Sequence, residues 1–243
     1  MVIDLENLDG ISEVIINRLK RFDSLFTDCE CLENYYDNDD ILQLIIDIDD
    51  YCLKNRIIGY HYTNAIENDI LEKGIILRNG KEIRNDFITR HFHLFTKSEQ
   101  NRIIQKWNEY FDEDDVNCRD NIVFFNFTKT ALFNGGAELL LNYYGGEQIF
   151  LPIYEEPKIG DKLKKIGIPM ILKCILNPND INTFIEYPWG KIVTSSYNRI
   201  KNPNACVVDQ DGYQRCEVKP DKIEIIKYEK STFANTRYSY LSL

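Results

Sequence analysis

The spacing of the apolar residues changes at residue 57, and this change most limits the folds open to the chain. Before it, apolar residues recur every three or four positions, the period of an amphipathic helix. Two such stripes are present: Ile11, Val14, Ile15, Leu19, Phe22, Leu25 and Phe26, then Ile41, Leu44, Ile45, Ile48 and Cys52. Asp39 or Asp40 is placed to cap the second helix. Residues 1–56 are therefore predicted to be helical.

From residue 57 onward, short runs rich in β-branched, aromatic or other apolar residues predict strands and extended pieces. These runs are residues 57–63, 75–77, 122–127, 148–154, 169–176, 216–218 and 222–228. Three helices are expected. The first covers residues 66–71 and is ended by Gly74, the second follows the capping box Thr96-Lys97-Ser98-Glu99, and the third covers residues 137–144. The acidic stretch 112–115 is predicted to be a loop. The sequence thus predicts an α+β fold, with an acidic helical extension at residues 1–56 ahead of a domain at residues 57–243.

The net charge of −10 is concentrated in the first part of the chain. Residues 1–56 contain 14 Asp and Glu against 5 Lys and Arg, whereas the rest contains 25 against 24. Two interpretations of the acidic segment stay open: a solvated helical face, or a segment that covers a basic cleft or meets a basic partner. The near-neutral remainder has no broad basic stripe for nucleic acid, although Lys162, Lys164 and Lys165 form a local cluster.

Composition places the chain among soluble globular proteins. No uninterrupted apolar run approaches the roughly 18 residues that a membrane span needs. The first residues lack the basic and then apolar stretches of a signal peptide. The seven cysteines are odd in number and scattered, which disfavours a disulfide framework. We therefore expect a cytoplasmic protein without a membrane partner.

Several common catalytic motifs are missing from the sequence. It has neither a Gly-rich phosphate loop, nor HExxH, nor GxSxG. His91 and His93 alternate on one segment, and Cys29 and Cys31 do the same, but neither pair is accompanied by further metal ligands at a suitable spacing. No metal site is predicted.

Three separated segments remain as candidates for chemistry. They are Tyr60-His61-Tyr62-Thr63-Asn64, the stretch 122–130 with its following corner 143–147, and Cys216-Glu217-Val218-Lys219-Pro220. The His-Tyr-Thr strand, with a following helix that ends in Glu72-Lys73-Gly74-Ile75, resembles the opening of bacterial ADP-ribosyltransferase-like domains, including the DarT-type nucleic-acid-modifying toxins. The third segment is similar to the late Glu strand of that superfamily. The resemblance covers roughly residues 57–228.

This resemblance implies a split β-sheet core around an NAD cleft and a role for each motif residue. His61 would contact the adenosine-side ribose of NAD, with Thr63 assisting. Tyr143 or, by slight preference, Tyr144 would stack on nicotinamide. Glu217 would take the catalytic position, with Glu147 as the alternative carboxylate. Tyr62 and Thr128 complete the expected cofactor-binding set.

Two features depart from the family pattern. The middle segment reads Phe127-Thr128-Lys129-Thr130, where many members have Ser-Thr-Ser. Arg215 stands two positions before Glu217, where an acidic residue or Gln accompanies modification of protein arginine. This departure disfavours an arginine acceptor and leaves nucleic acid or another acceptor open.

The chemistry needs few parts. Cleavage of the nicotinamide–ribose bond produces an oxocarbenium-like centre, which a nearby carboxylate stabilises. An aromatic ring and a polar residue then position the leaving base and the far ribose. Each residue also fits a structural role: a core histidine for His61, a helix cap for Thr63, packing for the tyrosines, and exposed charges for Glu147 and Glu217.

The leading hypothesis is transfer of ADP-ribose from NAD to a nucleic acid or protein, with release of nicotinamide. The resemblance implies a toxin or antiviral-defence effector, for which a neutralising or regulatory protein partner is a further expectation. Two alternatives stay open: a non-catalytic module that binds a nucleotide or partner, and an NAD glycohydrolase that uses water as the acceptor.

Overall fold

The computed structural model describes residues 1–111, 120–208 and 210–229. The strands are β1 (Val2–Ile3), β2 (Arg56–Ala65), β3 (Val123–Asn126), β4 (Ile168–Leu176), β5 (Ile181–Thr183), β6 (Asp211–Gln214) and β7 (Ile223–Lys227). The α-helices are α1 (Glu13–Leu19), α2 (Asp23–Asp28), α3 (Asp39–Leu53), α4 (Glu67–Lys73), α5 (Gly80–His91), α6 (Lys97–Tyr110), α7 (Ala131–Asn134), α8 (Glu138–Asn142), α9 (Glu147–Phe150), α10 (Pro157–Leu163) and α11 (Pro188–Lys201). Short 3₁₀ turns lie at Lys20–Phe22, Leu32–Tyr35, Phe92–Leu94, Pro178–Asp180 and Pro220–Lys222.

The strands form one sheet in the order β5-β6-β3-β2-β4-β7, and neighbours in this order are antiparallel. β1 pairs with the start of β2 in parallel. The central ladder between β2 and β4 is long, running from the pair Ile57–Leu176 to the pair Ala65–Ile168. By contrast, β2 and β3 are joined at the single pair Tyr60–Asn126. The sheet therefore has two halves with a narrow junction, and the chain is an α+β protein.

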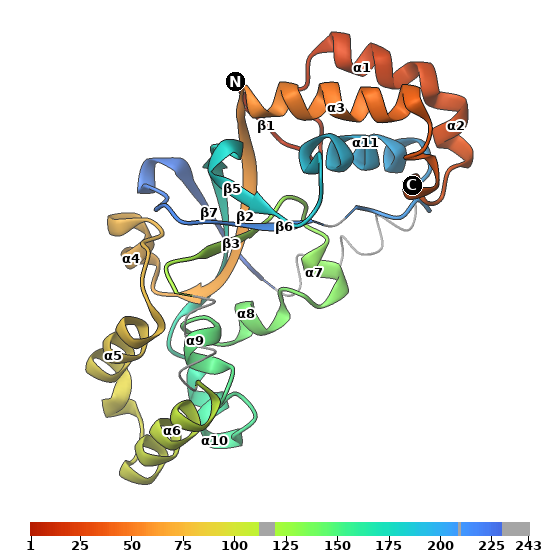
Figure 1. Cartoon of the computed structure of the whole chain (residues 1–243). Coiled ribbons are helices and arrows are strands. Elements are labelled where there is room, and N and C mark those ends of the chain that lie inside the picture. The colour runs from red at the N-terminus through yellow and green to blue at the C-terminus, as the bar shows by residue number, and fades with distance from the viewer. Residues whose placement is uncertain (112–119, 209, 230–243) are drawn as a thin grey trace.

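Helices cover the sheet in three groups (Figure 1). α1, α2, α3 and α11 pack on one face in a core that includes Phe26, Leu44, Trp189 and Ile192. α7 and α8 cover the other face of the sheet, where Leu141 packs against Tyr60 and Tyr62 of β2. α5, α6, α9 and α10 form a lobe beyond the end of β2, with their own core.

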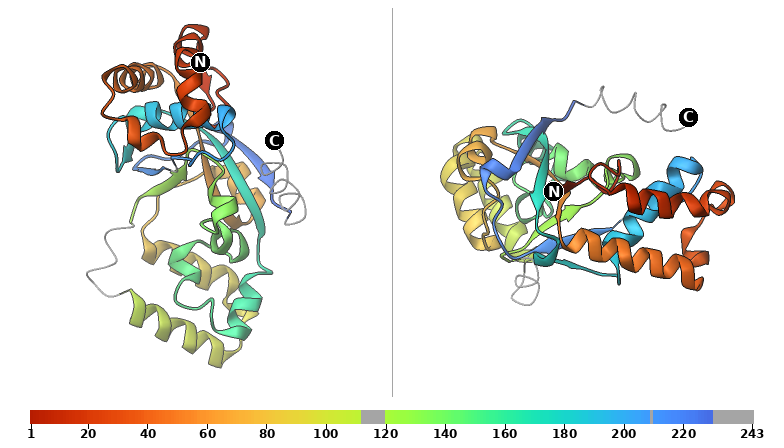
Figure 2. Two further views of the ribbon diagram at one scale, coloured as in Figure 1. Left: turned by 90° about the vertical axis from the view of Figure 1, so that its right-hand side faces the viewer. Right: turned by 90° about the horizontal axis from the view of Figure 1, so that it is seen from above.

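The acidic segment 1–56 shares its core with later parts of the chain. α3 and α11 run side by side, as the orange and blue helices of Figure 2 show. Asp49 of α3 is 6% exposed and accepts hydrogen bonds from the backbone N–H groups of Trp189 and Gly190 at 2.9 and 3.2 Å. Its carboxylate thus satisfies two donors at the start of α11 that helical hydrogen bonds leave without partners.

Most of the predicted elements are confirmed, with three changes at the N-terminus. Residues 2–3, predicted to be helical, form strand β1 and pair with β2. The stripe from Ile11 to Phe26 is divided between α1 and α2 by a 3₁₀ turn at Lys20–Phe22. The residue that caps α3 is Asn38, whose side chain accepts from the N–H groups of Asp40 and Ile41, so the prediction of Asp39 or Asp40 was wrong. The capping box at Thr96 is confirmed, as is the end of α4 at Gly74.

Three predicted strands are wrong. Residues 148–154 form α9 and turns, because Gly146 begins a helix whose Ile149, Phe150 and Ile153 pack into the lobe. In residues 75–77, Ile75 alone makes a β-bridge, to Val218, which is also the only paired residue of the predicted strand 216–218. The predicted loop 112–115 lies outside the described residues. Across the described parts of the chain, every helix is too short or too polar to span a lipid bilayer.

Candidate functional site

The end of β2 joins the first candidate segment to the corner that contains Tyr143, Tyr144 and Glu147. Asn64 is 1% exposed, and its side-chain N–H₂ donates to the backbone carbonyls of Leu141 and Asn142 at 3.2 and 3.3 Å. In return, the N–H of Gly145 donates to the carbonyl of Asn64 at 3.1 Å. The corner is therefore held directly against the strand that carries His61.

The third segment pairs with the chain that follows β2. The N–H of Ile75 donates to the carbonyl of Val218, and the N–H of Val218 donates to the carbonyl of Ile75, both at 2.9 Å. Gly74 makes this approach possible, because it has a φ of +71° and a Cβ there would collide with the Val218 carbonyl. The neighbour of Val218, Glu217, is exposed.

His61 lies at the junction between the two halves of the sheet. Its Nδ1 is 2.9 Å from the backbone carbonyl of Phe124 on β3. Because a carbonyl only accepts, Nδ1 carries the hydrogen, and in the neutral ring Nε2 is an acceptor. Burial lowers the pKa of His61, which favours this neutral form at pH 7. The side chain keeps partial exposure, although its ring packs 5.9 Å from that of Phe125.

The pKa of His61 gives a testable pH dependence. A histidine whose pKa is lower in the folded than in the unfolded state stabilises the fold above the unfolded value of about 6.5 and loses this contribution as pH falls. The NMR titration of the His61 ring should therefore have its midpoint below about 6.5. The fall in free energy of unfolding between pH 8 and pH 5 should be smaller in His61→Gln than in the wild type. A midpoint at or above 6.5 would contradict the burial of this ring.

The neighbours of His61 on β2 point in two directions, because side chains alternate along a strand. Thr63 shares the face of His61 and is partly buried. It does not cap the next helix, since α4 begins after Ile66 without a side-chain cap. Tyr62 lies in the core on the opposite face, and its hydroxyl donates to the carbonyl of Thr128 at 3.5 Å. His61 and Tyr62 therefore cannot contact a ligand from the same side of the sheet.

The two tyrosines of the corner differ in environment. Tyr144 is 8% exposed, and its hydroxyl lies 3.0 Å from Nε2 of His91. Tyr143 is partly exposed; its ring lies 5.5 Å from that of Tyr154, with the Lys164 ammonium 5.3 Å from its centre. Of the two, Tyr143 has the ring that is better placed to stack on a ligand. Glu147, the first residue of α9, is exposed.

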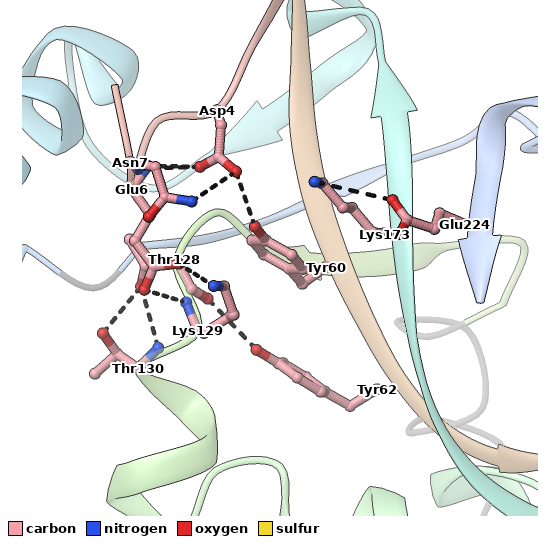
Figure 3. Close-up of polar contacts among 10 residues, drawn as sticks. All are labelled: Asp4, Glu6, Asn7, Tyr60, Tyr62, Thr128, Lys129, Thr130, Lys173 and Glu224. Carbon is pink, nitrogen blue, oxygen red and sulfur yellow. Dashed lines mark hydrogen bonds and ion pairs between the residues drawn. The ribbon is translucent and has the colours of Figure 1, made fainter. Parts of the chain in front are cut away.

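A buried polar cluster beside Thr128 was not anticipated from the sequence (Figure 3). Asp4, 6% exposed, accepts from the N–H of Glu6 at 3.1 Å and from the hydroxyl of Tyr60 at 3.3 Å. Glu6 forms an ion pair with Lys129 at 3.1 Å and accepts from the Lys129 N–H at 3.2 Å. The acidic N-terminal segment thus holds the loop that carries Thr128, through a contact between acid and base.

A hollow of about 350 Å³ opens between α7, α8 and Tyr228. Its lining residues are Leu132, Phe133, Asn134, Gly135, Ala137, Glu138, Leu141, Asn142 and Tyr228. None of the predicted site residues lines it, and it adjoins the Tyr62 face of the sheet rather than the His61 face. Among the residues that the structure describes, no group of three or more His, Cys, Asp and Glu side chains is arranged to hold a metal ion.

Comparisons of the chain with protein-family models, with curated proteins and with solved structures find no match. Candidate chemistry must therefore come from the residues themselves. Asn64 links the first segment to the corner, and Ile75, which follows α4, pairs with Val218 beside Glu217 in the third segment.

Proposed function

We propose that the chain is an ADP-ribosyltransferase-like enzyme that transfers ADP-ribose from NAD to a macromolecular acceptor and releases nicotinamide. The observation that carries the proposal is the pairing of Ile75 with Val218. It brings the segment after the His61 strand into contact with the segment of Glu217, two motifs that lie far apart in the sequence. The narrow junction between the halves of the sheet also supports a split-sheet core, and His61 lies at this junction.

In this mechanism, His61 acts as a neutral ring and Glu217 as a carboxylate. A ribose hydroxyl of NAD donates to Nε2 of neutral His61. The carboxylate of Glu217 accepts from the 2′-hydroxyl of the other ribose and stabilises the positive charge that develops at its C1′. Tyr143 stacks on the nicotinamide ring. The C1′–N bond breaks, nicotinamide leaves with the electron pair, and the acceptor nucleophile forms the new bond and loses its proton.

The acceptor is a nucleic acid or a protein, and the toxin or antiviral-defence role implied by the resemblance is part of the same proposal. The lysine cluster offers limited attraction for phosphate. Lys162 forms an ion pair with Glu99 at 2.6 Å, and Lys164 with Asp161 at 3.3 Å, so two of its three charges are already balanced. Nucleic acid would therefore be held by contacts other than a broad basic surface.

The test is nicotinamide release from NAD by the wild type, Glu217→Gln and Glu224→Gln, with RNA, DNA and cell lysate offered separately. Glu224 is the matched control because it is an exposed glutamate on the next strand, β7. We expect release by the wild type and by Glu224→Gln, and a rate lower by about 10²–10³ for Glu217→Gln. A mass increase equal to ADP-ribose on one offered sample would identify the acceptor.

Other outcomes favour the remaining hypotheses. Equal release by the wild type and Glu217→Gln would move the catalytic role to Glu147, to be tested by Glu147→Gln. Release without any modified acceptor would indicate an NAD glycohydrolase. Binding of NAD by the folded wild type without release would indicate a binding module.

A further inference from the structure

Two cysteines from distant parts of the sequence meet at the surface. Sγ of Cys31 lies 3.5 Å from Sγ of Cys206, although the two residues are 175 positions apart. Cys206 is exposed and Cys31 is partly exposed. A disulfide requires an S–S distance of about 2.05 Å. The two sulfurs are therefore about 1.5 Å farther apart than in a disulfide bond.

The backbone on both sides of the thiol pair is fixed by hydrogen bonds. The N–H of Cys206 donates to the carbonyl of Glu30 at 2.7 Å. The carbonyl of Cys29 accepts from the side chains of Asn198 and Asn202, at 3.2 and 3.1 Å, and both of these residues belong to the end of α11. The fold therefore holds the two sulfurs close to each other.

The remaining cysteines of the described residues have different surroundings. Cys29, Cys52 and Cys174 are at most 1% exposed. Burial raises the pKa of Cys174 to about 12, which keeps this thiol protonated and unreactive. Cys216 is exposed. Within the described part of the chain, Cys31 and Cys206 are the pair whose sulfur atoms are in contact.

We propose that Cys31 and Cys206 are a redox site, which forms a reversible disulfide by exchange with a low-molecular-weight disulfide such as glutathione disulfide. Exposed Cys206 loses its proton and attacks one sulfur of glutathione disulfide, and glutathione leaves as a thiolate that takes up a proton. Cys31 then loses its proton, attacks Sγ of Cys206 and releases the second glutathione. The protein loses two electrons and two protons, and glutathione disulfide becomes two molecules of glutathione.

The disulfide would join the acidic segment to the chain beyond α11. It closes a loop across most of the sequence, a kind of cross-link that removes much conformational freedom from the unfolded chain. In the native state the two ends already lie together, through the hydrogen bond from the N–H of Cys206 to Glu30 and those from Asn198 and Asn202 to Cys29. Oxidation should therefore raise the unfolding temperature by about 5–15 °C. This site is independent of NAD chemistry.

The test uses the full chain in glutathione buffers of increasing glutathione disulfide content, followed by acid trapping, digestion and mass spectrometry. The variants are Cys31→Ser and Cys206→Ser, with Cys216→Ser as the matched control at another exposed cysteine. We expect a peptide that links Cys31 to Cys206 and a mass loss of about 2 Da. Both should persist in Cys216→Ser and vanish in the first two variants, together with the rise in unfolding temperature. In 6 M urea the linked peptide should fall at least tenfold, because the fold no longer holds the thiols together.

Two results would overturn the proposal. One is the recovery of Cys31 and Cys206 only as separate mixed disulfides with glutathione. The other is an equal yield of the linked peptide in the folded and the urea-unfolded chain, because the fold would then not promote the Cys31–Cys206 disulfide.

Discussion

Replacing Gly190 with alanine is expected to lower the free energy of unfolding by about 3 kcal/mol. A Cβ at this position would collide with the backbone carbonyl of Ile45, whose carbon lies 2.8 Å from it. Helix α11 would have to move away from α3, and the hydrogen bonds from Trp189 and Gly190 to Asp49 would lengthen. In an exposed helix the same change would stabilise by about 1 kcal/mol, so the sign of the effect is diagnostic.

Urea unfolding followed by circular dichroism measures this effect, with Gly136→Ala as the control. Gly136 and Asn134 are both exposed, and the nearest atom to a new Cβ is Asn134 Oδ1, at 3.1 Å, which accepts from the N–H of Gly136 at 2.9 Å. The control should therefore stay within about 0.5 kcal/mol of the wild type. Because residues 1–56 share a core with α11 and the sheet, Gly190→Ala should shift one cooperative transition. A separate early transition for a small part of the signal would contradict the shared core.

The elements predicted from the sequence are those with a strong local signal. β2 is a run of β-branched and aromatic residues, β4 is a nearly continuous apolar run, and the two form the long central ladder. The capping box at Thr96 indicates the start of α6. For these elements local preference and tertiary packing agree, which is why sequence reasoning succeeds.

The helix α11 was missed because its sequence is rich in residues that favour other structures. Thr194, Ser195 and Ser196 weaken the helical signal, and all three are buried. Packing against α3 supplies the stability that the local sequence lacks. Pro188, at the first position of the helix, is the signal that could have located its start.

The candidate segments and the sheet faces of their side chains were predictable from the sequence, but the long-range contacts around them were not. The strand period places His61 and Thr63 on one side and Tyr62 on the other, which alternation alone could have indicated. The roles of Asp4 and Glu6 had no such signal, because their partners Tyr60 and Lys129 are brought to them by the fold. A contact across 123 positions, from Glu6 to Lys129, has no trace in local spacing.

Replacing Gly74 with alanine is expected to lower the free energy of unfolding and, under the proposed function, the rate of nicotinamide release. Gly74 has φ +71° and ψ −149°, a conformation that costs other residues about 1–3 kcal/mol. The new Cβ would also collide with the carbonyl of Val218 and lie 3.0 Å from the nitrogen of Pro220. The Ile75–Val218 pairing would open and Glu217 would move from its position. We therefore expect release to fall by at least about tenfold, since misplacement of about 1 Å can cost 10²-fold.

The control variant Gly146→Ala separates the effect of backbone strain in Gly74→Ala from the effect of losing the Ile75–Val218 pairing. Gly146 has φ +72° and ψ 179°, similar to Gly74, but no heavy atom lies within 4 Å of its new Cβ. Both variants bear the strain, so Gly74→Ala should be less stable than Gly146→Ala by the cost of the collision, about 1–3 kcal/mol. Urea unfolding gives this difference, and nicotinamide release at a temperature where both are folded gives the activity. If Gly74→Ala were folded and released nicotinamide at the wild-type rate, the Ile75–Val218 pairing could not be what positions Glu217.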